Sequence, residues 1–147
     1  MSQLIYLGSD HAGYELKDHL ISFIKSKLWN FQDEGCFNCE TTDYPISAHK
    51  VAEKIIQNPN NIGILICGSG NGMAMSANKH AHIRAALCWN ETLSELARAH
   101  NNANILCLPA RFINVELAEK ILDKFMMTPF EGGRHLRRVE NINLISK

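Results

Sequence analysis

A glycine-rich turn that begins with a cysteine is the segment of this 147-residue sequence best suited to chemistry. The apolar run 62–67 ends in Cys67, the turn 68–72 reads Gly-Ser-Gly-Asn-Gly, and the run 73–78 is compatible with a helix. Alternate glycines let the backbone turn sharply and aim several N–H groups at one point, and a helix behind them adds the positive end of its dipole. Such a helix N-terminus favours the thiolate, which is the reactive form of cysteine. The segment therefore predicts an anion-binding turn with a reactive thiol, the alternative being a buried structural cysteine at the end of a core strand.

Other groups that can transfer protons occur where predicted elements end. Asp10 and His11 follow the first strand, and His100 ends the helix before the fifth strand. A carboxylate, an imidazole and a thiol at one sheet edge suit proton transfer near neutral pH. We expect these groups to lie together near the carboxyl ends of the strands, where open α/β sheets bind ligands. The structural alternatives are that Asp10 caps the next helix and that His100 is favoured at a helix end by the dipole.

A basic cluster near the end of the chain contains Arg134, Arg137 and Arg138, within little more than one helical turn. Such clusters commonly form a solvated face. A phosphate group would give these arginines a shared ligand.

Short apolar runs alternate with amphipathic runs along the chain, which predicts a single α/β domain over residues 1–147. Strands are predicted at 4–8, 29–33, 62–67, 83–88 and 104–108, and helices at 14–28, 44–57, 73–78, 90–100, 115–127 and 134–145. This order predicts a three-layer, Rossmann-like fold in which helices cover both faces of a five-stranded parallel sheet. The last helix is long enough to leave the domain body.

The composition excludes several classes of function. Fifteen basic and fifteen acidic side chains cancel, so the protein has no overall field that would gather nucleic acid or an anionic membrane surface. The sequence begins with a strand instead of a basic leader, and five cysteines without a framework of spacings fit a reducing compartment. We therefore expect a cytoplasmic protein. The pair Cys36 and Cys39 has redox or zinc spacing, but it lies in a predicted loop without a second pair of ligands, so no metal site is predicted there.

Taken together in their order, the motifs resemble the B-type ribose-5-phosphate isomerases. The matching segments are Gly8-Ser9-Asp10-His11-Ala12-Gly13, Thr42-Asp43-Tyr44-Pro45, the run 63–72, Ala77-Asn78-Lys79, Ile83-Arg84-Ala85, His100-Asn101 and Glu131-Gly132-Gly133-Arg134-His135. The resemblance implies interconversion of ribose 5-phosphate and ribulose 5-phosphate through a cis-enediolate, as in the pentose phosphate pathway, without a cofactor or metal ion. The wider family also contains allose-6-phosphate isomerase and subunits of galactose-6-phosphate isomerase, so a hexose 6-phosphate is the alternative substrate.

Residue roles also follow from the resemblance. Cys67 matches the base that moves the proton between C2 and C1, His100 matches the residue that opens the furanose ring, and Ser69 matches a catalytic hydroxyl beside the turn amides. The implied substrate-binding positions are Asp10, His11, Gly68, Ser69, Gly70, Asn71, Gly72, Asn101, Arg111, Arg134 and Arg138, of which the three arginines would bind phosphate. The resemblance further implies a homodimer, or a tetramer built from it, with sites at the subunit interface and the last helix extending toward the partner.

Two other classes fit parts of the sequence. A nicotinamide-binding oxidoreductase could use Gly68 and Gly70, but the third glycine stands at Gly72 instead of the next position, and the turn does not follow the first strand. A non-catalytic family subunit would keep the fold and bind sugar phosphate. The joint presence of Cys67, His100 and the arginines argues against that second class.

Overall fold

The computed structural model describes residues 3–36 and 42–143. Within them the strands are β1 (Leu4–Ser9), β2 (Asn30–Asp33), β3 (Ile62–Cys67), β4 (Ala85–Leu87) and β5 (Ile105–Pro109). The helices are α1 (Tyr14–Ser26), α2 (Tyr44–Gln57), α3 (Asn71–Ala77), α4 (Glu91–Ala99), α5 (Val115–Met127) and α6 (Arg134–Asn141). Every predicted element is present. The last helix ends at Asn141, short of the predicted residue 145.

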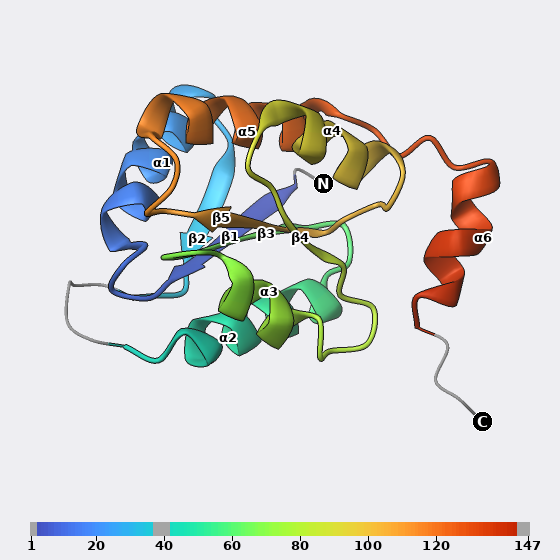
Figure 1. The fold of residues 1–147 in the computed structure, drawn as a ribbon, viewed down its shortest axis with the longest axis horizontal. Helices are drawn as coiled ribbons and strands as arrows, with labels where there is room; N and C mark the ends of the chain where they lie inside the picture. The colour runs from blue at the N-terminus through green and yellow to red at the C-terminus, as the bar shows by residue number, and fades with distance from the viewer. Residues whose placement is uncertain (1–2, 37–41, 144–147) are drawn as a thin grey trace.

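The five strands form one parallel sheet in the order β2-β1-β3-β5-β4. Helices α1, α4 and α5 lie on one face and α2 and α3 on the other, as Figure 1 shows. Both faces of a parallel sheet are then covered, which explains why all six residues of β3 are buried. The predicted three-layer fold is confirmed.

Each face of the sheet has its own apolar core. On one face, Leu20 of α1 and Phe125 of α5 pack with Ile64 of β3. On the other face, Val51 of α2 and Met73 of α3 join Leu65. Because both cores clamp the central strand, its carboxyl end is held in a fixed position.

A buried lysine fixes the segment that follows β2. Lys17 of α1 is 1% exposed, and its Nζ lies 2.7 Å from Oδ1 of Asp33 and donates to the carbonyl oxygen of Cys36. A buried ammonium group needs such partners because it has lost its water. Cys36 is buried, while Cys39 lies outside the described residues.

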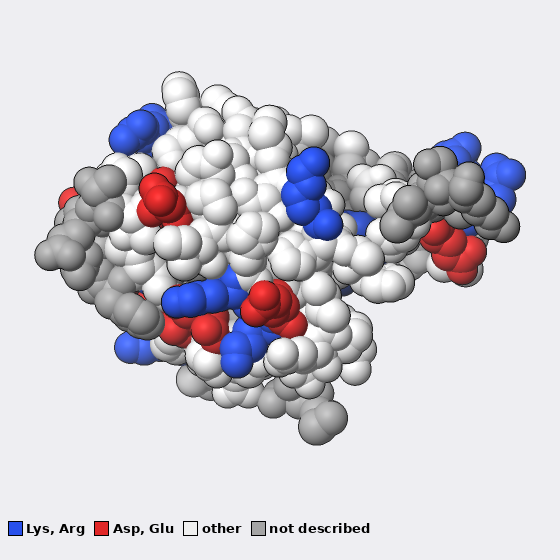
Figure 2. All heavy atoms as spheres, turned by 90° about the horizontal axis from the view of Figure 1, so that it is seen from below, with Lys and Arg blue, Asp and Glu red and all other residues white. Residues whose placement is uncertain are grey.

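Helix α6 stands away from the three layers, beyond the end of the sheet where the strands begin (Figure 1). The segment before α6 is tied to the end of α4, because the N–H of Glu131 donates to the carbonyl oxygen of Ala99 over 3.0 Å. In Figure 2, the end of the molecule formed by α6 carries both basic and acidic side chains, while much of the rest of that face is uncharged. None of the described helices combines the length and the apolar character required to cross a membrane.

Candidate active site

The thiol of Cys67 lies at the carboxyl end of the central strand, in contact with the glycine turn. The residue is 4% exposed, and its Sγ accepts a hydrogen bond from the backbone N–H of Gly70 over 3.2 Å. Gly70 has φ +78°, and a Cβ there would lie 2.4 Å from Cδ1 of Leu87. Only glycine fits this conformation in this space, so the residue type fixes the position of the donor. The turn therefore places a backbone N–H donor directly on the sulfur.

The rest of the turn is held by local contacts. Ser69 Oγ accepts a hydrogen bond from the N–H of Asn71 over 3.3 Å. The ring of Tyr44 packs on Gly72 so closely that a Cβ there would lie 2.5 Å from it. The amides of the turn are therefore held in place by packing around the loop. The turn leads into α3, whose seven residues lie close to the predicted run 73–78 and add only a small dipole.

Arg111 lies beside the glycine turn because the segment after β5 is hydrogen-bonded to that turn. The N–H of Ala110 donates to the Cys67 carbonyl oxygen over 2.9 Å, and the N–H of Arg111 donates to that of Gly68 over 3.0 Å. The Arg111 side chain then covers Gly68, where a Cβ would lie 3.2 Å from its Nη1. This brings an exposed guanidinium group to the edge of the turn, where it can bind an anion.

Asp10 and His11 lie at the end of β1, next to β3. The N–H of Asp10 donates to the Ile66 carbonyl oxygen over 3.3 Å, and Oδ1 of Asp10 accepts from the N–H of Gly13 over 3.0 Å. The carboxylate thus closes the turn before α1, close to the capping role considered above. Within the described part of the chain, His11 Nδ1 is buried without a hydrogen-bond partner. Buried polar atoms normally have partners, so His11 has bonding capacity left for a ligand.

His100 and Asn101 do not join this group within one chain, and the expectation that they would is wrong. His100 follows α4, which runs back against the strands, and β5 begins only at Ile105. Ile105 pairs with Gly63, whereas Pro109 pairs with Cys67. The four-residue length of β3 between these pairs spans about 13 Å, so His100 lies at the amino edge and Cys67 at the carboxyl edge. Sequence periodicity placed His100 before a strand, but the direction of α4 decides which edge it occupies.

At the amino edge, His100 forms a compact cluster with two residues from the segment before α6 and its first turn. Its ring stacks on that of His135, with centroids 4.2 Å apart and planes 11° apart. Oε2 of Glu131 lies 3.7 Å from Nε2 of His100 and 3.3 Å from Nε2 of His135. His135 is buried, and its pKa is lowered by burial first and then by the positive charge of His100 and Arg134.

Although these three side chains place one atom each within 4.8 Å of the others, they do not make a good metal centre. A ligand lone pair lies in the plane of its imidazole ring, and two stacked, nearly parallel planes do not meet at a common nearby point. Sequence analysis assigned no role to Glu131 or His135. Gly132 and Gly133, both at positive φ, lie between Glu131 and His135 and turn the chain. No sequence pattern near these two residues indicates that they contact His100.

Arg134 and Arg138 lie one turn apart on α6, and both are exposed. Both belong to the positive groups that lower the pKa of His135, so they lie on the same side of the molecule as His100. The predicted site residues thus form two groups. Asp10, His11, Cys67, the turn 68–72 and Arg111 occupy the carboxyl edge, while His100, Asn101, Arg134 and Arg138 occupy the amino edge.

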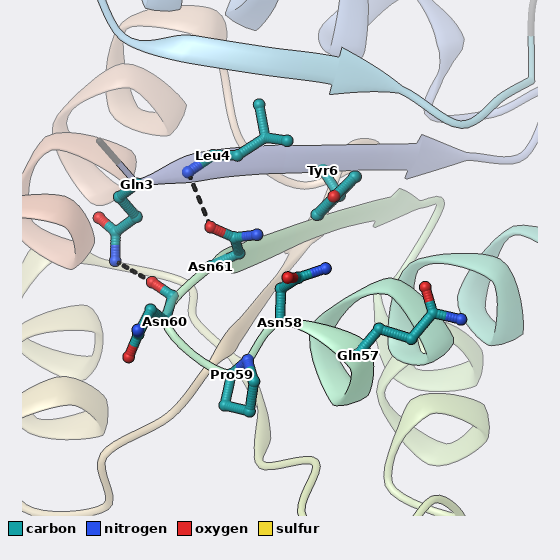
Figure 3. A pocket seen from close by; sticks show the side chains of 8 residues that line it. All are labelled: Gln3, Leu4, Tyr6, Gln57, Asn58, Pro59, Asn60 and Asn61. Carbon is teal, nitrogen blue, oxygen red and sulfur yellow. Dashed lines mark hydrogen bonds between the residues drawn. The ribbon is translucent and has the colours of Figure 1, made fainter. Parts of the chain in front are cut away.

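A hollow of about 530 Å³ lies elsewhere, at the amino ends of β1 and β3 (Figure 3). Amide side chains dominate its lining, with Gln3 Nε2 donating to the Asn60 carbonyl oxygen and the N–H of Leu4 donating to Asn61 Oδ1, each over 2.9 Å. Its lining residues include none of the predicted site residues. Size alone therefore does not identify the reactive site here.

Comparison with known proteins places this arrangement in context. Residues 5–142 match the family model described as Ribose/Galactose Isomerase. A putative sugar phosphate isomerase of Rickettsia conorii is 47% identical over 138 residues, covering 94% of this chain and 96% of that protein. Ribose-5-phosphate isomerase B of Escherichia coli is 38% identical over 143 residues, covering 97% and 96%.

Solved structures of ribose 5-phosphate isomerases are also similar to this chain. A ribose 5-phosphate isomerase of Thermotoga maritima superposes with a TM-score of 0.95 at 46% identity, covering 99% of this chain and 100% of that one. Ribose-5-phosphate isomerase B of Mycoplasma genitalium with bound ribulose-5-phosphate superposes with a TM-score of 0.94 at 44% identity, covering 97% and 95%.

Proposed function

The chain belongs to the ribose/galactose isomerase family, and we propose that it is an aldose-ketose isomerase that interconverts ribose 5-phosphate and ribulose 5-phosphate. The observation that carries this proposal is the contact between the Cys67 thiol and the Gly70 amide, 3.2 Å apart at the end of the central strand. A base beside preorganised amides suits removal of a proton next to a carbonyl group.

In this mechanism Cys67 takes the proton from C2 of the open-chain aldose. The electron pair left on C2 forms the C1–C2 double bond of a cis-enediolate, and its negative charge is on oxygen. Amides of the 68–72 turn, with the Ser69 hydroxyl group, stabilise that oxygen. The hydroxyl proton on O2 then passes to O1, so that C2 becomes the carbonyl carbon, and Cys67 returns its proton to C1. One base serves both carbons because they are adjacent and the intermediate is planar, so the proton balance closes without a cofactor.

The division of the site residues between two edges supports a homodimer. A substrate held at Cys67 lies more than the length of β3 from His100 of the same chain, too far for both groups to touch it. In a two-fold dimer, each surface patch meets the equivalent patch of the other copy in reversed direction. The carboxyl edge of one copy can then meet the amino edge of the other, so that each site combines Cys67 from one chain with His100, Arg134 and Arg138 from the second.

A surface suited to that association joins the two edges. Trp89 and Phe112, 41% and 60% exposed, lie near the carboxyl ends of β4 and β5, with ring centroids 5.2 Å apart. Leu93 and Leu96 continue the apolar surface along α4 toward His100, beside a hollow of about 480 Å³. If the same apolar surface of a second copy covered this one, the apolar side chains would be buried. The carboxyl edge of each copy would then lie against the amino edge of the other.

Ring opening comes before isomerisation in the forward direction, because ribose 5-phosphate is mostly a closed furanose. We assign the proton donor for the ring oxygen to His100. Arg111, Arg134 and Arg138 bind the phosphate group, which turns binding energy remote from the reacting carbons into correct positioning. Cys67, Cys88 and Cys107 are free thiols, which supports a cytoplasmic location.

A direct assay tests the proposal. Purified protein is given ribose 5-phosphate and, separately, allose 6-phosphate, and the ketose product is measured. We expect conversion of the pentose phosphate with the higher kcat/KM. Preference for the hexose phosphate would keep the chemistry and change the substrate, while turnover of neither would overturn the proposal. Sedimentation of the same sample distinguishes a dimer from a tetramer.

A further inference from the structure

The residues around His100 include two that the proposed mechanism does not yet use. Glu131 and His135 come from the segment before α6 and from its first turn, and both contact the His100 side chain. Glu131 is 58% exposed and His135 is buried. Two stacked imidazole rings share a single carboxylate in this cluster. The arrangement is specific, because an isolated imidazole ring could form its hydrogen bonds with water instead.

The positive charges around His135 oppose its protonation. His100, Arg134 and Arg138 each lower the pKa of His135, while Glu131 raises it. Cys88, after β4, lines the same hollow as His100, but burial raises its pKa to about 12 and it stays neutral. Glu131 is the acidic group in contact with both rings.

Burial has a larger effect on the pKa of His135 than any one of these charges has. Loss of water lowers the pKa of His135, so its neutral form is favoured. His100 is more exposed and faces the hollow. A neutral ring stacked on His100 limits its rotation and leaves its edge open toward substrate.

We propose that Glu131 and His135 are positioning residues for His100: the Glu131 carboxylate stabilises the imidazolium that donates a proton to the ring oxygen, and the stacked His135 ring holds its plane. In the step they support, the bond between C1 and the ring oxygen breaks, the ring oxygen gains the proton from His100, and the C1 hydroxyl group releases one to solvent. The aldehyde forms with no net proton consumed. In the proposed dimer, Asp10, His11 and Arg111 of the second copy also face this site.

This inference rests on the proposed function, and the direction of the reaction separates the two. Ribulose 5-phosphate cannot close the same furanose ring, since its C5 oxygen carries the phosphate group, so it enters as an open chain. Residues that act only through His100 should therefore matter for ribose 5-phosphate and much less for ribulose 5-phosphate. If the unmodified protein converts neither sugar, the proposed function fails. If it converts both and the variants show no directional effect, this inference fails alone.

The test compares Glu131→Gln and His135→Phe with the unmodified protein in both directions across pH 5.5 to 9. Glutamine keeps the shape and the backbone hydrogen bond to Ala99 but removes the charge. We expect Glu131→Gln to lower kcat/KM for ribose 5-phosphate about five- to tenfold, and to move the loss of forward activity at rising pH about 0.5 to 1 unit lower. Initial rates with ribulose 5-phosphate should change less than about twofold by the same argument.

The His135 variants separate stacking from simple architecture. Phenylalanine keeps a stacked ring, so His135→Phe should retain forward activity that His135→Ala loses. Glu140→Gln is the matched control, because it makes the same acid-to-amide change at a position on α6. It should leave the rates in both directions of the reaction and the pH profile unchanged. Equal losses in both directions, or an unmoved forward pH profile in Glu131→Gln, would overturn the proposal. It would also fail if a chelator gave the unmodified protein the Glu131→Gln profile, since the cluster would then act through a metal ion.

Discussion

The backbone N–H of Gly70 donates a hydrogen bond to Sγ of Cys67 across 3.2 Å, three residues back along the chain. The contact exists because Gly70 has φ +78°, which folds the turn back onto the end of β3. The sulfur of a residue at the end of a buried strand is thereby placed against a backbone N–H donor. In the proposed reaction, the turn that holds the sulfur would also stabilise the negative charge that forms on the substrate oxygen.

Replacing Cys67 by alanine should abolish most isomerisation in both directions. Loss of a general base costs about a hundred- to ten-thousandfold in rate. The fold and substrate binding should remain, because the sulfur acts only in proton transfer. Turnover is measured by ketose formation and binding by calorimetry. Cys107→Ala, which removes a buried thiol from neighbouring β5, is the control, and wild-type turnover in Cys67→Ala would contradict the mechanism.

Gly70→Ala should destabilise the protein more than Gly132→Ala does. Both glycines have positive φ, but a Cβ at Gly70 would lie 2.4 Å from Leu87, whereas at Gly132 nothing lies within 4 Å. Backbone strain costs about 1 to 2 kcal/mol at either site, and the clash adds about 1 to 3 kcal/mol at Gly70. Urea unfolding at one protein concentration measures the difference. Equal losses would mean that the core adapts to the added methyl group.

Phosphate binding should depend on two of the three arginines of α6. Arg134→Ala and Arg138→Ala should each raise KM for ribose 5-phosphate about tenfold or more, since charge-assisted hydrogen bonds contribute about 1.5 to 3 kcal/mol. Arg137→Ala, on the same helix, serves as the control and should have little effect. Free ribose should be a very poor substrate for the intact protein. Similar kinetics for ribose and its phosphate would remove the proposed role of these arginines.

Two inactive variants should restore activity when their chains are mixed. Cys67→Ala and His100→Asn chains, unfolded together and refolded, should form about half mixed dimers, each with one intact site. The mixture should then reach roughly a quarter of wild-type activity with ribose 5-phosphate. Each variant refolded alone provides the baseline. Activity no higher than that baseline, in a sample shown to contain mixed dimers, would place both residues in a site within one chain.

Acid should destabilise the folded protein partly through His135. Its folded-state pKa lies below the ordinary value of about 6.5 that it has when unfolded, mainly because it is buried. As pH falls below that ordinary value, the unfolded chain takes up a proton before the folded protein does, so the free energy of unfolding decreases. His135→Phe should weaken this dependence between pH 7.5 and 5.5. An unchanged slope in urea unfolding at fixed protein concentration would show that His135 does not contribute.

Much of the fold was predictable from local pattern. Alternating apolar and amphipathic runs gave all five strands and six helices in the described chain, because burial on both sheet faces and a 3.6-residue period leave a direct trace in the sequence. The glycine turn was also visible, since the residue types that permit such a turn are few. The short helix that was predicted after it, at 73–78, is present at Asn71–Ala77.

The arrangement of the site was only partly predictable. Cys67, Asp10 and Arg111 lie at one edge because each follows a parallel strand, and strand direction is implied by the alternating pattern. His100 follows a helix instead, so it lies at the opposite edge.

What the sequence determined by itself was therefore the chemistry of the groups and the elements that carry them, because both depend on residue type and near neighbours. Tertiary structure alone decided which groups meet. It divided the predicted residues between two edges about 13 Å or more apart, and it stacked His135 on His100 across 35 positions of sequence, with Glu131 beside both rings. Such contacts arise from how helices cross the sheet, and no local periodicity records that crossing.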